Sequence, residues 1–238
     1  MAEANLSPLQ GFNERLSACE RCPRLRAHCE EVARVRRKAY AHEEYWGRPV
    51  PSFGDEKARV LLLGLAPGAH GSNRTGRPFT GDGSGEFLFP VLHEMGFASQ
   101  PRAVARQDGM RLRGMWISAV VRCAPPGNQP TPEEQRNCAP WLDEEIALLT
   151  ELRVVLCLGK IAFDGFLAYG LRNGCIKSRS GLAFAHGAEV ALDGGLTLLA
   201  SYHPSLQNTN TGKLTRAMFL EVFTRARQRA GWDGAPSQ

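Results

Sequence analysis

The sequence contains no run of about 20 consecutive apolar residues, the length that a membrane-spanning helix needs. Its N-terminal segment MAEANLSPLQ also lacks the apolar core of a secretion signal. We therefore expect a cytoplasmic protein with no membrane partner. A disulfide framework is disfavoured in that reducing environment, so the 7 cysteines are expected to be metal ligands, catalytic groups or buried side chains.

Strong charge of one sign is also missing, since the formal net charge is +5 with 22% charged residues. This excess favours a polyanionic partner, but many enzymes of small acidic metabolites share it. The sequence has no internal repeat. Its 238 residues, 43% of them hydrophobic, are enough to bury one full core. We expect a monomer with a single domain over residues 1–238.

Apolar segments at regular intervals predict the strands of one sheet. Helical patterns separate them, including one that opens with a capping box at Thr131 and Glu134 and another that starts near Ser84. Strands alternating with helices predict an α/β fold with three layers, α/β/α, around a mostly parallel sheet of about four strands. The four expected strands lie in residues 58–67, with an apolar run at 60–63, and in residues 115–123, 153–159 and 196–204.

Other segments are expected to lie around this core. Residues 1–50 mix helical periodicity with dense charge and are predicted to form a helical arm. Residues 181–195 are a candidate hairpin, a final helix is predicted from about Thr211, and residues 232–238 are expected to be a disordered tail.

Four cysteines have spacing suited to a metal site. Cys19 and Cys22 are separated by two residues in the arm, while Cys123 and Cys138 follow the second strand. Thiolates at such spacing can reach one metal and would join the arm to the core. Zinc and a 4Fe-4S cluster both accept four thiolates, so spacing does not decide between them, and unconnected buried cysteines are the alternative.

Two loops leave the ends of predicted strands, where open α/β sheets bind ligands. The first, residues 64–71, is rich in glycine but lacks the Gly-Lys-Ser/Thr ending of a P-loop. The second carries His203 beside a proline. Taken separately, the first loop is equally well a plain turn, and a single histidine is more often structural than catalytic.

In combination, these motifs resemble the uracil-DNA glycosylase superfamily, and most of all its family 5, the iron-sulfur glycosylases. The resemblance rests on GLAPG at 64–68, RPFTG at 77–81, VVRCAPPGN at 120–128, HPS at 203–205 and the four cysteines. It implies a DNA-repair enzyme that hydrolyses the N-glycosidic bond of uracil, and of other deaminated or modified bases, in double-stranded DNA. It also implies a 4Fe-4S cluster on Cys19, Cys22, Cys123 and Cys138, with zinc as the alternative.

The resemblance also implies catalytic roles. His203 would donate a hydrogen bond to the departing base, while Asp82 and Asn128 are the two candidates for positioning the attacking water, although either could instead cap a turn. Related families carry an acidic or amide side chain where this chain has Ala66, which cannot act as a base.

Substrate contacts follow from the same resemblance. Phe79 would stack on the flipped base, and Leu206 would fill the space that the base leaves. Ala119 replaces an asparagine that reads uracil in several related families, so we expect looser base selection. The remaining expected binding residues are Gly64, Ala66, Pro67, Gly68 and Ser205. The basic residues expected at the DNA backbone are Arg74, Arg77, Arg122, Lys213 and Arg216.

Two other functions fit parts of the sequence. Ala66 favours a non-catalytic, zinc-containing nucleic-acid-binding module. A phosphate-ester hydrolase would use the glycine-rich loop, but no dense set of carboxylates for catalytic metal ions accompanies that loop.

Overall fold

The computed structural model, which describes residues 6–233, contains a mixed six-stranded sheet in the order β1-β3-β2-β4-β6-β5. The strands are β1 (Phe53–Gly54), β2 (Val60–Gly64), β3 (Met115–Ala119), β4 (Val154–Leu158), β5 (Glu189–Ala191) and β6 (Thr197–Ser201). The four central strands are parallel, and the short edge strands β1 and β5 pair antiparallel. The predicted α/β class is therefore confirmed, with two edge strands beyond the four expected.

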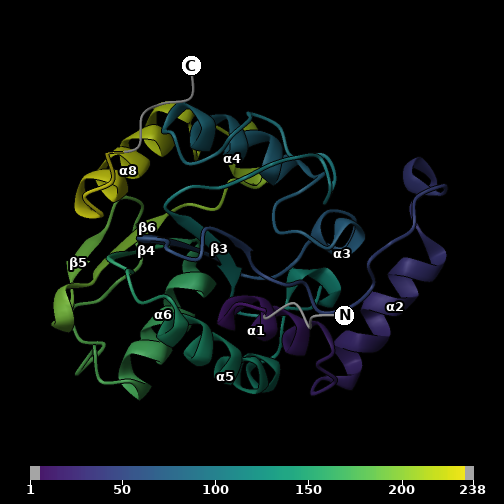
Figure 1. Ribbon diagram of the computed structural model, residues 1–238, viewed down its shortest axis with the longest axis horizontal. Helices are drawn as coiled ribbons and strands as arrows, with labels where there is room; N and C mark the ends of the chain where they lie inside the picture. The colour runs from purple at the N-terminus through teal and green to yellow at the C-terminus, as the bar shows by residue number, and fades with distance from the viewer. Residues whose placement is uncertain (1–5, 234–238) are drawn as a thin grey trace.

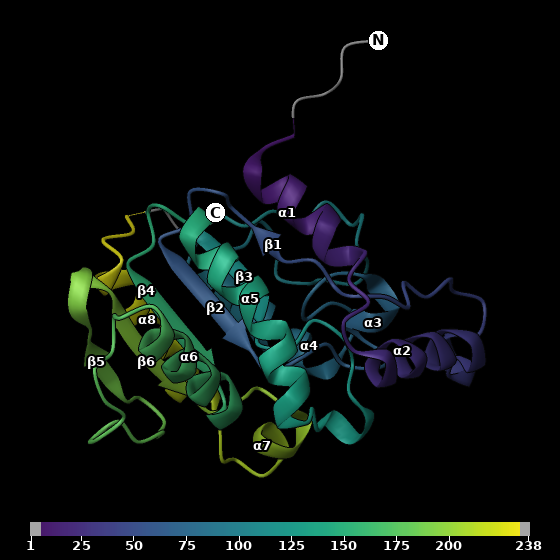
Figure 2. The same cartoon turned by 90° about the horizontal axis from the view of Figure 1, so that it is seen from below.

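The central strands are buried on both faces because their side chains alternate between two apolar cores. In β2, Leu61 and Leu63 enter one core, and Val60 and Leu62 enter the other. Helices α4 and α8 cover the second face, while α5 and α6 cover the first, which gives three layers (Figures 1 and 2). Within residues 6–233, no helix is long and apolar enough to cross a membrane.

Local sequence signals account for most helix boundaries. The predicted capping box of α5 is confirmed, because Thr131 Oγ1 accepts from Glu134 N and Glu134 Oε2 accepts from Thr131 N. The helices are α1 (Pro8–Ser17), α2 (Pro23–Val35), α3 (Ser72–Thr75), α4 (Gly83–Glu94), α5 (Pro132–Leu148), α6 (Lys160–Arg172), α7 (Leu206–Asn210) and α8 (Arg216–Arg229). Short 3₁₀ turns are η1 (Lys38–Tyr40), η2 (Pro126–Asn128) and η3 (Asp193–Gly195).

Two predicted elements near the C-terminus are wrong. Residues 181–195 do not form a hairpin, because their one strand, β5, pairs with β6 instead. The final helix does not start at Thr211, since Gly212 adopts a φ of 72° and Thr215 caps α8 further along the chain.

The expected disordered tail does not begin at Trp232. This side chain stacks on Phe97, with ring centroids 6.2 Å apart and 14° between the ring planes. Residues 234–238 of that tail lie outside the described residues.

Helices α1 and α2 occupy the segment expected to be a helical arm. Helix α1 lies against α5, and α2 lies beside α3 (Figure 1). Phe12, Leu16, Leu25 and Cys29 of the arm are buried, so apolar packing alone already attaches it to the core.

Candidate active site

A cavity of about 660 Å³ lies where loops leave the carboxyl ends of β2, β3 and β6. The loop before α4 and the turn η2 complete its walls. All of the residues that the sequence assigned to catalysis or substrate binding line it. They are Gly64, Ala66, Pro67, Gly68, Phe79, Asp82, Ala119, Asn128, His203, Ser205 and Leu206.

Phe79 is held in a strained backbone conformation, with a φ of 51°. Its N–H donates to Ser72 Oγ at 3.1 Å, which helps to keep the chain in this left-handed region. The ring lies close to Gly64, where an added Cβ would make a tight contact of 3.3 Å with Phe79 Cζ. The backbone therefore fixes this aromatic ring in the cavity wall.

His203 lies next to Phe79, with the ring centroids 5.9 Å apart. Burial lowers the pKa of His203 to about 4, so the imidazole is neutral near pH 7. Asn208 Nδ2 donates to the backbone oxygen of His203 at 2.8 Å and holds the loop. A neutral imidazole offers one N–H donor in the cavity.

Asp82 caps a helix and also lines the cavity. Its Oδ1 accepts from Gly85 N at 2.9 Å and caps α4. Its Oδ2 lies against the glycine-rich loop, where a Cβ on Gly71 would overlap it and one on Gly68 would lie 3.5 Å away. Burial raises the pKa of Asp82 above its ordinary value, which makes this carboxylate a stronger base.

The remaining candidates lie around the rim. Asn128 is exposed at the end of η2 with a φ of 57°. Ala119 ends β3, and Ser205 caps α7 by accepting from Asn208 N. The Leu206 side chain is 57% exposed although it packs on Gly83, so a large apolar group faces solvent at the cavity mouth.

Sequence reasoning missed a buried polar network behind the cavity. Glu145 is fully buried and accepts from Trp116 Nε1 at 2.7 Å, from Ser118 Oγ at 2.6 Å and from Arg122. Ser118 and Arg122 also line the cavity. Glu145 sits among the apolar positions of α5, and that position of a charged residue was the only signal in the sequence.

Three of the basic residues expected at the DNA backbone are not free to reach it. Arg74, Arg77 and Arg122 are at most 6% exposed. They pair with Glu43, Asp108 and Glu145 respectively. The expectation is wrong for these three because buried guanidinium groups are held by buried or neighbouring carboxylates.

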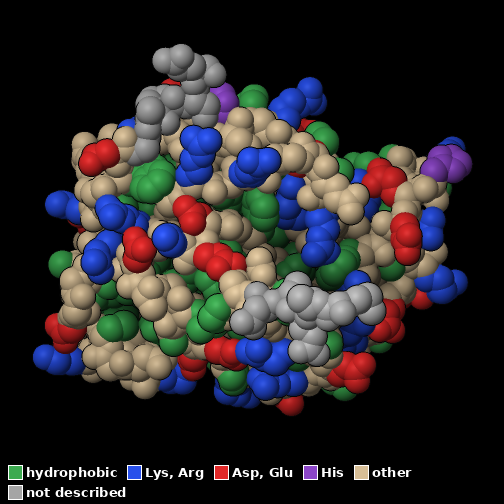
Figure 3. All heavy atoms as spheres, in the orientation of Figure 1, with side chains coloured by type: hydrophobic (Ala, Val, Ile, Leu, Met, Phe, Trp, Pro, Cys, Tyr) green, Lys and Arg blue, Asp and Glu red, His purple; other side chains and the backbone are tan. Residues whose placement is uncertain are grey.

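The other two expected contacts lie at the surface. Lys213 Nζ lies 4.9 Å from the centre of the Tyr202 ring, and Arg216 pairs with Glu94. On the face seen in Figure 3, basic and acidic side chains are interspersed and form no continuous basic patch. Any attraction of DNA to this face must therefore be local.

Cys19, Cys22, Cys123 and Cys138 line one small cavity of about 20 Å³. Trp141 Nε1 donates to Cys19 Sγ at 3.3 Å, and Asn137 Nδ2 lies 3.8 Å from Cys22 Sγ. Such donors suit sulfurs that carry negative charge, so the chemistry of this set fits a group held by four thiolates.

The side chains of the four cysteines do not converge as the ligands of one metal ion would. A fifth cysteine, Cys29, lies behind them with its Sγ accepting from Ala124 N at 3.2 Å, and burial raises the pKa of Cys138 to about 11. Within residues 6–233, no three His, Cys, Asp or Glu side chains converge closely enough to hold a metal ion. The four cysteines are neighbours without forming a closed site.

Comparison with known proteins gives consistent matches. The family model described as the uracil DNA glycosylase superfamily matches residues 51–227. A Type-5 uracil-DNA glycosylase of Thermus thermophilus is 56% identical over 223 residues, 93% of this chain and 98% of the relative. The Type-5 enzyme of Pyrobaculum aerophilum is 46% identical over 220 residues, 92% of each chain. The resemblance predicted from the sequence motifs is confirmed.

Proposed function

The chain belongs to the uracil DNA glycosylase superfamily, and we propose that it hydrolyses the N-glycosidic bond of uracil in double-stranded DNA, leaving an abasic site. One observation carries the proposal: Phe79 and Asp82 from the loop before α4, and His203 from the loop after β6, line one cavity. An aromatic face, a carboxylate and a neutral donor are what base excision from a flipped nucleotide needs.

The first step is to hold the nucleotide outside the duplex. Phe79 stacks on the flipped base and replaces the neighbours that it loses. Leu206, exposed at the cavity mouth, fills the space left in the duplex. Exposing a large apolar side chain is unfavourable in the free protein and is offset when the side chain enters the base stack.

Two groups that line the cavity are assigned to the cleavage step. As the bond between C1′ and the base nitrogen breaks, the base departs with the electron pair, and His203 donates a hydrogen bond to it. Asp82 orients the water that attacks C1′ and takes up its proton. Asn128, on the rim, provides a second polar contact for the water or sugar, whereas Ala66 provides none.

Base selection should be broad. Ala119 offers a methyl group at the position from which a side chain would read the base edge, so the cavity lacks that discriminating hydrogen bond. Other deaminated or modified bases are therefore expected as substrates alongside uracil.

In this proposal the four neighbouring cysteines would be the ligands of a 4Fe-4S cluster. Because two of the four thiolates come from the arm and two from the core, they would connect the arm to the core when they hold the cluster. The Trp141 and Asn137 donors would stabilise the sulfurs of Cys19 and Cys22. Metal analysis and the visible spectrum of protein purified without air test this part. Stoichiometric zinc in colourless protein would contradict it.

The activity is tested with a labelled duplex containing one uracil and a matched duplex containing thymine. After incubation and treatment with alkali, strand cleavage at the uracil alone is expected. An intact strand over a wide range of protein concentrations would contradict the proposal and favour a module that only binds nucleic acid.

A further inference from the structure

Tyr45 connects the arm to the catalytic cavity. It belongs to the segment after α2 and is 7% exposed. Its hydroxyl oxygen lies 3.1 Å from His70 Nδ1, and it accepts from the backbone N–H of Arg37 at 3.3 Å. His70 ends the glycine-rich loop and lines the cavity. A partly buried hydrogen-bond chain therefore runs from the arm to the cavity wall.

The direction of this chain fixes the tautomer of His70. The Tyr45 hydroxyl is buried and has one proton to donate, and His70 Nδ1 is the one acceptor in contact with it among residues 6–233, so that proton is directed to Nδ1. Nδ1 is then an acceptor, so in the neutral ring the proton sits on Nε2. Nε2 has no hydrogen-bond partner among residues 6–233, and the side chain is only half-buried.

The surroundings of His70 favour an anionic ligand. Burial, followed by the nearby charges of Arg37 and Arg74, lowers the pKa of His70 and keeps the ring neutral near pH 7. Glu43 faces Arg74 and pairs with it, while Arg37 forms no ion pair within the described residues. An N–H donor in a positive field suits an anion.

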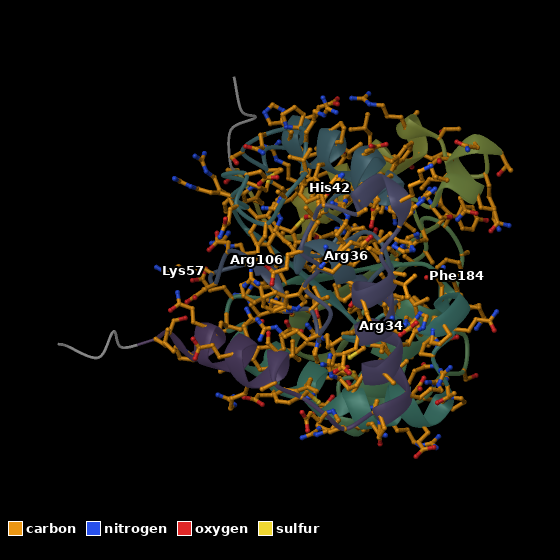
Figure 4. All side chains as sticks on the ribbon, turned by 90° about the vertical axis from the view of Figure 1, so that its right-hand side faces the viewer. Arg34, Arg36, His42, Lys57, Arg106 and Phe184 are labelled. Carbon is orange, nitrogen blue, oxygen red and sulfur yellow. The ribbon has the colours of Figure 1, made fainter. Side chains whose placement is uncertain are left out.

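We propose that His70 binds a backbone phosphate beside the flipped nucleotide through Nε2–H, and that Tyr45 is the positioning residue that fixes its tautomer. This inference rests on the glycosylase function proposed above. It gives the arm a role in substrate binding, because Tyr45 belongs to the arm and contacts His70. Figure 4 labels Arg34, Arg36 and His42, three other residues of the arm.

The test measures binding to duplexes in which single phosphates around the uracil are replaced by uncharged methylphosphonates. His70→Ala should bind the unmodified duplex about tenfold more weakly, the size expected for one hydrogen bond to a charged group. At one phosphate position, methylphosphonate should weaken wild-type binding by a similar factor and leave His70→Ala unchanged. An equal penalty in both proteins at every position would overturn the proposal.

Two further variants separate this role from a structural one. His70→Gln retains a side-chain N–H donor and should recover part of the affinity, and His42→Ala, an exposed histidine of the same segment, should bind like wild type. In ¹⁵N NMR spectra of the wild type, the His70 proton should lie on Nε2, and Tyr45→Phe should produce a mixture of tautomers. A proton on Nδ1 would overturn the proposal. Uracil release by the wild type is scored separately, so loss of the function and loss of this contact remain distinguishable.

Discussion

The rings of Phe79 and His203 lie with their centroids 5.9 Å apart and their planes 31° from parallel. Phe79 precedes α4, and His203 follows β6, so the pair exists only because the parallel strands bring their carboxyl ends to one edge of the sheet. In the proposed function, a base stacked on Phe79 would lie close to the His203 ring.

Phe79→Ala should weaken binding of the flipped base. Base–aromatic stacking contributes about 1–3 kcal/mol, so KM should rise roughly 5- to 150-fold with a smaller change in kcat. Single-turnover rates over a range of enzyme concentrations measure both quantities. Phe184→Ala is the control, because that ring packs on Phe163 and is not among the residues that line the cavity. An unchanged KM in Phe79→Ala would contradict the stacking role.

Asp82→Asn should separate capping from catalysis. Asparagine caps a helix as well as aspartate, so the free energy of unfolding should change little, while loss of the base lowers kcat by roughly 10²–10⁴-fold. Asp82→Ala should lose about 1 kcal/mol of stability in addition. Thr131→Ala removes the matching cap of α5 and should lower stability without lowering kcat. Full activity in Asp82→Asn would exclude Asp82 as the base.

The low pKa of His203 predicts a stability change in mild acid. Between pH 6.5 and about 4, the unfolded chain binds a proton that folded His203 does not, so the free energy of unfolding falls as the pH is lowered across this window. A shift of this size corresponds to about 3 kcal/mol. Denaturant titrations of wild type and His203→Asn measure it, and the variant should show a shallower decline. Parallel curves for the two proteins would contradict the burial of a neutral His203.

The sequence predicted the sheet core well because its signals are local. The apolar run Val60–Leu63 and the capping box of Thr131 each depend on neighbouring residues only. The edge strand β5 was mispredicted because Val190 pairs with Leu198 of β6, a choice that depends on the rest of the sheet.

The candidate site was predicted from motifs whose residues all meet in one cavity, but its supporting contacts were not. His70 and Glu145 acquire partners only through tertiary contacts, with Tyr45 on the arm and with Arg122 after β3. Likewise, Arg77 has the appearance of a DNA contact in the sequence, whereas the structure pairs it with Asp108. Pairing between distant residues has no local signal for a reader of the sequence to find.

Leu206→Ala should slow excision from duplex DNA more than from single-stranded DNA. A base that is already unstacked needs no wedge, so only the duplex reaction depends on filling the vacated space. The ratio of the two single-turnover rates measures the effect. Leu171→Ala, which truncates another exposed leucine on α6, should leave that ratio unchanged. Equal slowing on both substrates would argue for a packing role of Leu206.

The most direct test of the account is single-turnover release of free uracil from a duplex, measured by mass spectrometry for the wild type and for the double variant Asp82→Asn/His203→Ala. We predict that the wild type releases uracil and that the double variant binds the duplex but releases it at least about a thousandfold more slowly, since it lacks both the base and the leaving-group donor. Undiminished release by the double variant, or no release by the wild type, would contradict the account.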